Sequence, residues 1–156
     1  MQKITPYFWF KNQAEEAANF YVSVFKNSAI KKISRLGQNE HTEGNEVVVV
    51  DFVLDGQEFT AMNGGPHFSF SQAISFLVDC QSQEEVDYYW EKLTAGGEAQ
   101  MCGWLIDKFG VSWQVVPAVL IEMMNDSDKV KAQNVMNAML QMKKIDITTL
   151  KQAYNQ

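Results

Sequence analysis

Side chains of the types that catalyse reactions are few in this sequence, and they lie far apart along it. His67 follows the turn-forming run Gly64-Gly65-Pro66, and a loop histidine can act as a general base near neutral pH. We favour the alternative that its imidazole bonds the backbone, because no second histidine or carboxylate lies nearby in the sequence. Cys102 could act as a nucleophile, but no partner base accompanies it. The sequence thus indicates no catalytic set.

Three of the four tryptophans, Trp9, Trp104 and Trp113, fall on predicted strands. By default we expect each ring to pack in the core, and the alternative is that it stacks on a ligand. Successive side chains on a strand point to opposite faces, so Trp113 and Gln114 are predicted to face opposite sides of their sheet. If Gln114 faces a site, Trp113 belongs to the core beneath a helix.

Composition and charge exclude several classes of protein. The chain has 156 residues, of which 46% are hydrophobic and 12% aromatic, which suits one globular domain or two small halves that share a core. No apolar run approaches the roughly 20 residues of a membrane span. The net charge is −6, and the one basic cluster (Lys31, Lys32, Arg35) reads as the solvated face of a strand, which argues against nucleic-acid binding. The N-terminus lacks a signal-peptide pattern, so we expect a cytoplasmic protein with two reduced cysteines, Cys80 and Cys102.

The elements that carry these residues come in two similar sets. In the first set, Asn12 and Glu15 form the pattern of a capping box ahead of an amphipathic helix. Asp55-Gly56 is the strongest hairpin signal in the sequence. A polar loop over 37–45, in which we expect His41 to be exposed, separates two strands. The expected elements are strands over 4–10, 28–36, 46–54 and 57–62 and a helix over 13–26.

The second set repeats this order. A strand over 73–79 precedes Ser82 and Glu85, which form another capping box, and Gly96-Gly97 ends the helix. A hairpin over 103–117 follows, with a glycine in its turn that can supply a positive φ. Shifting the sequence by 69 residues aligns the apolar faces of the two helices, which indicates a duplication.

The segment 118–156 has no counterpart in the first set. Asp126-Ser127 is a candidate cap for a third helix, and residues 146–154 are predicted to form a short final helix. Five of the eight methionines lie in this tail, and methionine adapts to irregular surfaces. These methionines either fill gaps in a core, or they form a dimer contact or a lid over a ligand, and the sequence leaves both interpretations open.

This organisation resembles the vicinal oxygen chelate superfamily, which includes glyoxalase I, bleomycin-resistance proteins, fosfomycin-resistance enzymes and extradiol dioxygenases. Within it, the segments 4–28, 55–70 and 102–117 look like the PhnB-like family, often labelled 3-demethylubiquinone-9 3-methyltransferase. The resemblance implies an α+β fold of two tandem βαβββ modules, 1–66 and 67–117, whose curved mixed sheet surrounds a cavity. We expect residues 118–156 to add C-terminal helices to one globular domain, and the family usually forms homodimers.

Metal-using members of the superfamily take ligands from the first and last strands of each module, and the resemblance places those positions here. The last-strand glutamate of those members corresponds to Gln114, whose neutral carbonyl oxygen is a poor ligand. The other positions fall near Pro6, near Ala61 or Met62, and near Ala73, and none of these residues can hold a cation. We therefore expect no metal centre and no cofactor.

Under the same resemblance, several side chains lie around the cavity mouth or wall. Together with Trp9 and His67, the candidate ligand-cavity residues are Met62, Asn63, Cys102, Trp104 and Gln114. An aromatic cavity with few charges suits a small, largely apolar or aromatic molecule, so we expect a small-molecule-binding protein that contacts neither nucleic acid nor membrane.

Two other functions remain open at this point. One is a metal-dependent enzyme of the glyoxalase or dioxygenase type that uses atypical ligands, with Gln114 and His67 as candidates. The other is the methyl transfer that the family label names. The second has little support in the residues, because no glycine-rich turn joins a strand to a helix in the way that nucleotide-like cofactors require.

Overall fold

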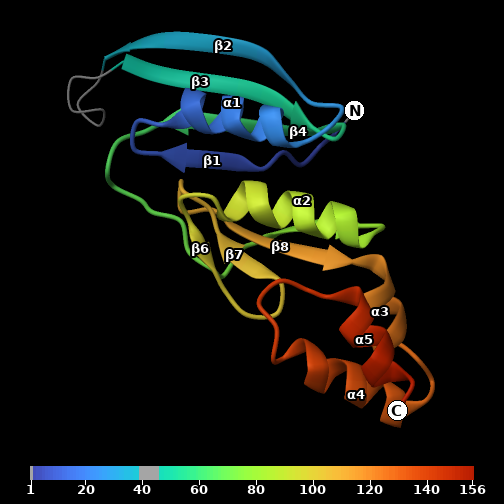
Figure 1. Ribbon diagram of the computed structural model, residues 1–156. Helices are drawn as coiled ribbons and strands as arrows, with labels where there is room; N and C mark the ends of the chain where they lie inside the picture. Colours follow the sequence, from blue (N-terminus) through green and yellow to red (C-terminus); the bar gives the residue numbers. More distant parts are fainter. Residues whose placement is uncertain (1, 39–45) are drawn as a thin grey trace. The chain divides into compact units, whose positions relative to one another are not determined.

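The computed structural model describes residues 2–38 and 46–156, so His41 and most of the predicted loop over 37–45 lie outside the described residues. The chain divides into two compact units, Met1–Phe70 and Ser71–Gln156 (Figure 1). Each unit builds its own sheet and its own core, and residues 118–156 pack within the second unit.

The first unit is a four-stranded mixed sheet with one helix. The strand order is β1-β4-β3-β2, with β1 parallel to β4 and the other pairs antiparallel. The predicted turn at Asp55-Gly56 is confirmed, since both residues have positive φ. The elements are β1 (Tyr7–Phe10), α1 (Ala14–Val24), β2 (Ala29–Gln38), β3 (Glu46–Leu54) and β4 (Gln57–Asn63).

Helix α1 covers one face of this sheet because its apolar residues recur at helical spacing and form a single buried stripe. Tyr21 lies in that stripe, and side chains at alternate positions of the strands point toward it from the sheet. Phe8, Phe52 and Phe59 contact Tyr21 or one another with ring centroids 5.6–6.5 Å apart. Because side chains alternate along a strand, this aromatic core determines which residues of the sheet face the opposite side.

The second unit repeats the topology. Its strand order is β5-β8-β7-β6, with β5 parallel to β8, as in the first sheet. The α+β class and the predicted duplication are therefore confirmed. The predicted turn glycine of the last hairpin, Gly110, has a φ of +90°. The elements are β5 (Phe76–Cys80), α2 (Gln83–Thr94), β6 (Glu98–Ala99), β7 (Trp104–Ile106) and β8 (Ser112–Pro117).

The start of α2 agrees with the predicted capping box in its main feature. The Ser82 hydroxyl accepts a hydrogen bond from the backbone N–H of Glu85 at 3.2 Å. The Glu85 carboxylate accepts in turn from the N–H of Gln81 at 2.7 Å, one residue earlier than the usual reciprocal bond. Two donors ahead of the helix are thereby satisfied, and the chain enters α2 in a fixed direction.

Three helices form the tail, one more than the sequence predicts. Helix α3 (Ala118–Met124) begins directly after β8, because Pro117 ends the strand and serves as the helix N-cap. Helix α4 (Lys129–Met139) is capped by Asp128, so the predicted cap at Asp126-Ser127 is wrong by one residue. Helix α5 (Ile147–Tyr154) agrees with the predicted final helix over 146–154, and it is capped by Asp146.

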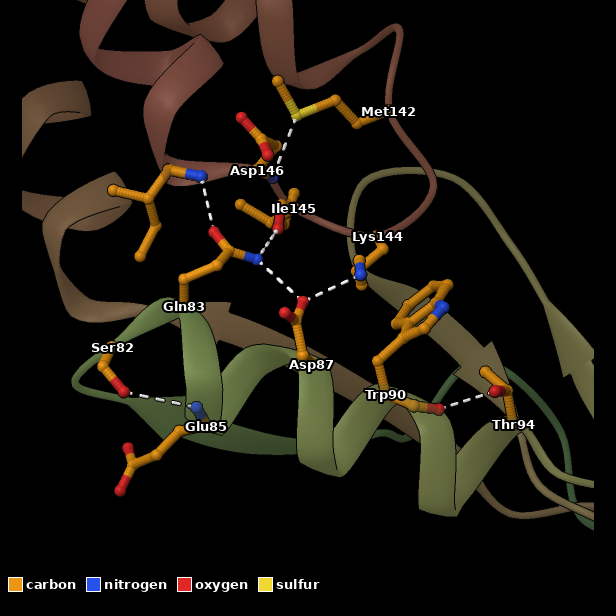
Figure 2. A network of polar contacts seen from close by, with 11 residues as sticks. Ser82, Gln83, Glu85, Asp87, Trp90, Thr94, Met142, Lys144, Ile145 and Asp146 are labelled. Atoms are coloured by element: carbon orange, nitrogen blue, oxygen red, sulfur yellow. Dashed lines mark hydrogen bonds and ion pairs between the residues drawn. The ribbon is translucent and has the colours of Figure 1, made fainter.

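The segment 142–147, which we call the strap, joins the tail to α2. Gln83 donates through Nε2 to the carbonyl of Ile145 at 3.0 Å and accepts at Oε1 from the N–H of Ile147 at 2.8 Å (Figure 2). The side chain of Gln83, the first residue of α2, thus bonds the backbone on both sides of Asp146, the N-cap of α5. In the part of the chain that the structure describes, no helix is both long and apolar enough to cross a membrane.

Candidate functional site

The face of the first sheet opposite α1, which we call the open face, carries two adjacent rows of side chains that are partners in the strand register. The rows lie two residues apart along each strand, so all their side chains point the same way. The apolar row consists of Trp9, Met62 and Val49. The polar row consists of Tyr7, Thr60, Asp51 and Lys32. The open face therefore sets an apolar strip beside a polar one, and none of these side chains is buried.

Trp9 is held in place by the segment that follows β4. Its indole Nε1 donates a hydrogen bond to the carbonyl of Gly65 at 3.0 Å, and Phe68 meets the ring edge-on with centroids 5.0 Å apart. Gly64 leaves the necessary room, because a Cβ at that position would lie 2.3 Å from the ring. The indole is nevertheless only half-buried. A rigid aromatic surface is thus presented next to Met62.

Asn63 has a different role from its neighbours. Its side-chain Oδ1 accepts a hydrogen bond from the N–H of Ala14 at 2.7 Å, so the end of β4 caps the start of α1. The sequence predicts this cap at Asn12, which is wrong. The N-cap residue is Gln13, and its side chain makes no capping bond. Asn63 is predicted as a cavity residue, and its side chain is engaged at the helix end.

In the second unit, the corresponding row of side chains is uncharged. Leu77, Gln114 and Trp104 are register partners on the face of the sheet opposite α2. The Gln114 amide donates through Nε2 to the hydroxyl of Ser75 at 2.8 Å. Trp113 is only 3% exposed, so the predicted opposition of Trp113 and Gln114 is confirmed.

The remaining candidates lie apart from these rows. His67 is exposed in the segment after β4 that forms neither helix nor strand. Cys102 is half-buried between β6 and β7, with a φ of 61°, and its N–H donates to the strap at 2.7 Å. Cys80 is buried, and this burial, with smaller effects of Glu85 and Asp79, raises the pKa of its thiol to about 12. Cys80 is therefore a neutral thiol and a poor nucleophile at neutral pH.

The positions at which metal-using relatives hold a cation do not fit a metal in this chain. Gln114 is engaged with Ser75, Ala61 is buried in the core, and Pro6 and Ala73 have no side-chain donor. Within residues 2–38 and 46–156, no group of three or more His, Cys, Asp or Glu side chains is arranged to hold a metal ion. The donor set thus disagrees with a divalent-metal site of the superfamily's usual kind.

The glycine-rich segment also does not fit a nucleotide-like cofactor such as S-adenosylmethionine. Gly64 and Gly65 follow a strand, but the chain beyond them does not enter a helix whose N-terminus could face a charged cofactor group. Both glycines instead contact Trp9. The conformational freedom of this segment therefore serves to position an aromatic ring.

The polar row is the part of the open face that the sequence-based interpretation missed. Asp51 interrupts a strand of valines and aromatic residues, and a carboxylate at such a position was the available signal. Its Oδ1 accepts a hydrogen bond from the Thr60 hydroxyl at 2.7 Å. Ser75, the partner of Gln114, lies just before β5 and gives no comparable signal in the sequence.

Comparison with known proteins places the chain in a family. The family described as 3-demethylubiquinone-9 3-methyltransferase matches residues 2–116, so α3, α4 and α5 lie outside the match. The structure of the PhnB protein from Bacillus cereus is 40% identical, with a TM-score of 0.67, and the match covers 75% of this chain and all (100%) of that one. No curated protein is similar enough to this sequence to count as a match.

More distant structures share the fold alone. Protein PA1353 from Pseudomonas aeruginosa is 20% identical with a TM-score of 0.63, over 75% of this chain and 98% of that one. The fosfomycin resistance protein FosX from Listeria monocytogenes is 19% identical with a TM-score of 0.57, over 80% of this chain and 98% of that one. The chain belongs to the 3-demethylubiquinone-9 3-methyltransferase family, the PhnB-like members of the vicinal oxygen chelate superfamily.

Proposed function

We propose that this protein binds a small aromatic or largely apolar molecule on the open face of its first sheet, with Trp9 and Met62 as the main contacts. The observation that carries the proposal is that Trp9 is both firmly packed and partly exposed. Its ring is fixed by Gly65 and Phe68, yet part of it remains uncovered on a sheet face. A tryptophan that served only as core would be packed on both sides, as Trp113 is.

The fixed ring favours binding in energetic terms. A side chain that is already immobilised loses little conformational entropy when a ligand stacks on it, so more of the contact energy appears as affinity. Met62 lies beside Trp9 in the register, and its thioether adapts to rings of different outline. In the second unit, Trp104 beside Gln114 offers a surface of the same kind, with an amide for orientation.

The test is isothermal titration calorimetry with indole and 2-phenylethanol as probes. We expect saturable binding of at least one probe to the unmodified protein and a loss of about tenfold or more in affinity in Trp9→Leu. Trp90→Leu is the matched control, because Trp90 is also half-buried but lies on α2, a helix of the second unit. Equal loss in both variants, or no binding of either probe, would contradict the proposal.

The family label suggests methyl transfer as a rival function, and the same protein sample can be used to test it. A ligand that binds only the folded state at a hundredfold excess over its Kd stabilises it by about 2.7 kcal/mol. If the protein used S-adenosylmethionine, this compound would therefore raise the Tm by several degrees. We expect no such rise, and a saturable rise would replace our proposal with methyl transfer.

We also propose that the protein is a homodimer, as the resemblance to its family implies. Tyr7 and Leu77 are large side chains on the sheet faces opposite the helices, and they are 57% and 53% exposed in a single chain. Sedimentation velocity should give the mass of two chains. A monomer at micromolar concentration would contradict this proposal and leave the binding proposal in place.

A further inference from the structure

Strand β2 departs from regular pairing at two points, and the first lies between Ile30 and Lys32. Ile30 is the partner of Phe52 and Lys32 is the partner of Asp51, so Lys31 is an extra residue between two consecutive pairs. This arrangement is a β-bulge, and bulges redirect side chains at sites where a strand must present them differently. As a consequence, two successive lysines line the same hollow instead of pointing to opposite faces.

That hollow has a volume of about 510 Å³ and lies within the first unit, at the end of the polar row. Its charged side chains are two lysines and two carboxylates, so the lining is formally neutral and carries both signs. The lining residues are Thr5, Lys31, Lys32, Asp51, Phe52, Glu58, Phe59 and Thr60.

The charged side chains that line the hollow, all in the described part of the chain, do not form ion pairs with one another. Lys32 and Asp51 are partners in the register, yet among the described residues neither Lys31 nor Lys32 forms an ion pair. Farther along the same strand, Arg35 pairs with Glu15 at 2.9 Å and with Glu46 at 3.6 Å. Asp51 uses one carboxylate oxygen for the Thr60 hydroxyl, which leaves its second oxygen for a donor from outside the chain.

A ligand that satisfies this lining must carry both signs. A purely anionic molecule would place its charge near the Asp51 and Glu58 carboxylates, and a purely cationic one would meet two ammonium groups. A neutral apolar molecule would cover the half-buried Asp51 without offering it a hydrogen bond, which is unfavourable. An ammonium group next to a carboxylate on one carbon, as in an α-amino acid, meets both requirements.

We propose that the hollow binds the α-amino and α-carboxylate groups of an aromatic amino acid. The ammonium group donates to Asp51, and the carboxylate accepts from Lys31 and Lys32. The ring lies along the apolar row, which is roughly 7 Å away because the two rows are two residues apart. This inference rests on the proposed function, since the ring would contact Trp9 and Met62, and it adds the chemical class of the ligand.

The first test compares ligands by calorimetry on the unmodified protein. The probes are L-phenylalanine, N-acetyl-L-phenylalanine, L-phenylalanine methyl ester and 2-phenylethanol. We expect L-phenylalanine to bind at least about tenfold more tightly than each of the other three, because each lacks one or both charges. If 2-phenylethanol binds as tightly as L-phenylalanine, this inference fails and the proposed function stands. If no probe binds, both fail.

The second test changes the hollow. Asp51→Asn and Lys32→Met should each weaken L-phenylalanine binding about tenfold and leave the affinity for 2-phenylethanol unchanged. Asp55→Asn, in the β3–β4 turn, and Lys26→Met, after α1, are exposed matched controls and should change neither affinity. Equal effects of a hollow variant on both probes would show a general disturbance of the sheet and would overturn the assignment.

Discussion

Asp107 accepts a hydrogen bond from the indole Nε1 of Trp113 at 2.8 Å inside the second unit, and both side chains are 3% exposed. The other carboxylate oxygen of Asp107 accepts from the N–H groups of Phe109 and Val111 at 2.8 and 3.0 Å. One buried carboxylate thus fixes both the β7–β8 turn and the tryptophan beneath the row that contains Gln114.

We therefore expect Asp107→Asn to be strongly destabilising. An amide can replace one acceptor oxygen but not both, so either the indole N–H or the two turn N–H groups lose their acceptor. The cost should be about 1–3 kcal/mol in the free energy of unfolding. Urea denaturation measures it, with the exposed turn variant Asp55→Asn as control. A loss below about 0.5 kcal/mol in Asp107→Asn would show that the buried bonds contribute little.

Gly64→Ala tests the support of Trp9. The added methyl group would lie 2.3 Å from the indole, so the ring or the segment must move. Such overpacking typically costs about 1–3 kcal/mol and should alter the near-ultraviolet circular dichroism of tryptophan. Gly37→Ala is the control, because nothing lies within 4 Å of a Cβ at that position. An unchanged spectrum and unchanged stability in Gly64→Ala would refute the proposed packing.

Asn63→Ala tests the cap of α1. Loss of the bond to the Ala14 N–H should reduce the free energy of unfolding by about 1 kcal/mol. Asn12→Ala should change it by less than about 0.5 kcal/mol, because Asn12 is exposed and provides no cap. If Asn12→Ala were the more destabilising variant in the same urea titration, the cap would be Asn12, as the sequence suggested.

The strap should make stability sensitive to acid. Hydrogen bonding to Lys144, and then to Gln83, holds the pKa of the Asp87 carboxyl below its ordinary value (Figure 2). A carboxyl whose folded pKa is lowered contributes stability above its unfolded pKa, and this contribution is lost as pH falls through the folded value. The stability difference between the unmodified protein and Asp87→Asn should therefore be present at pH 6 and shrink below about pH 4. A difference that is the same at both pH values would contradict this account.

Much of the fold follows from the sequence because its signals are local and strong. The valine-rich strand Glu46–Leu54, the Asp55-Gly56 turn and the Ser82 cap each depend on a few neighbouring residues, and all three are confirmed. The cap of α1 could not be found in this way. Its acceptor, Asn63, lies 49 residues away, and a nearer asparagine offered the same chemistry.

The site was less predictable for the same reason. Trp9 and Met62 could be named as candidates, but their neighbourhood depends on a parallel pairing between β1 and β4 that local patterns do not specify. The bulge at Lys31 is likewise a property of the pairing between β2 and β3. The sequence pattern assigns Lys31 and Lys32 to a solvated strand face, but both lysines line a hollow.

The most direct test of the central claim is fluorine NMR of the protein labelled with 5-fluorotryptophan, which should give one resonance for each of its four tryptophans. Single Trp→Phe variants assign the signals, and L-phenylalanine and 2-phenylethanol are then added in turn. We predict that the Trp9 resonance shifts and saturates while the resonance of buried Trp113 stays in place. A Trp9 resonance that does not respond to either probe, or shifts confined to Trp90, would contradict binding on the open face.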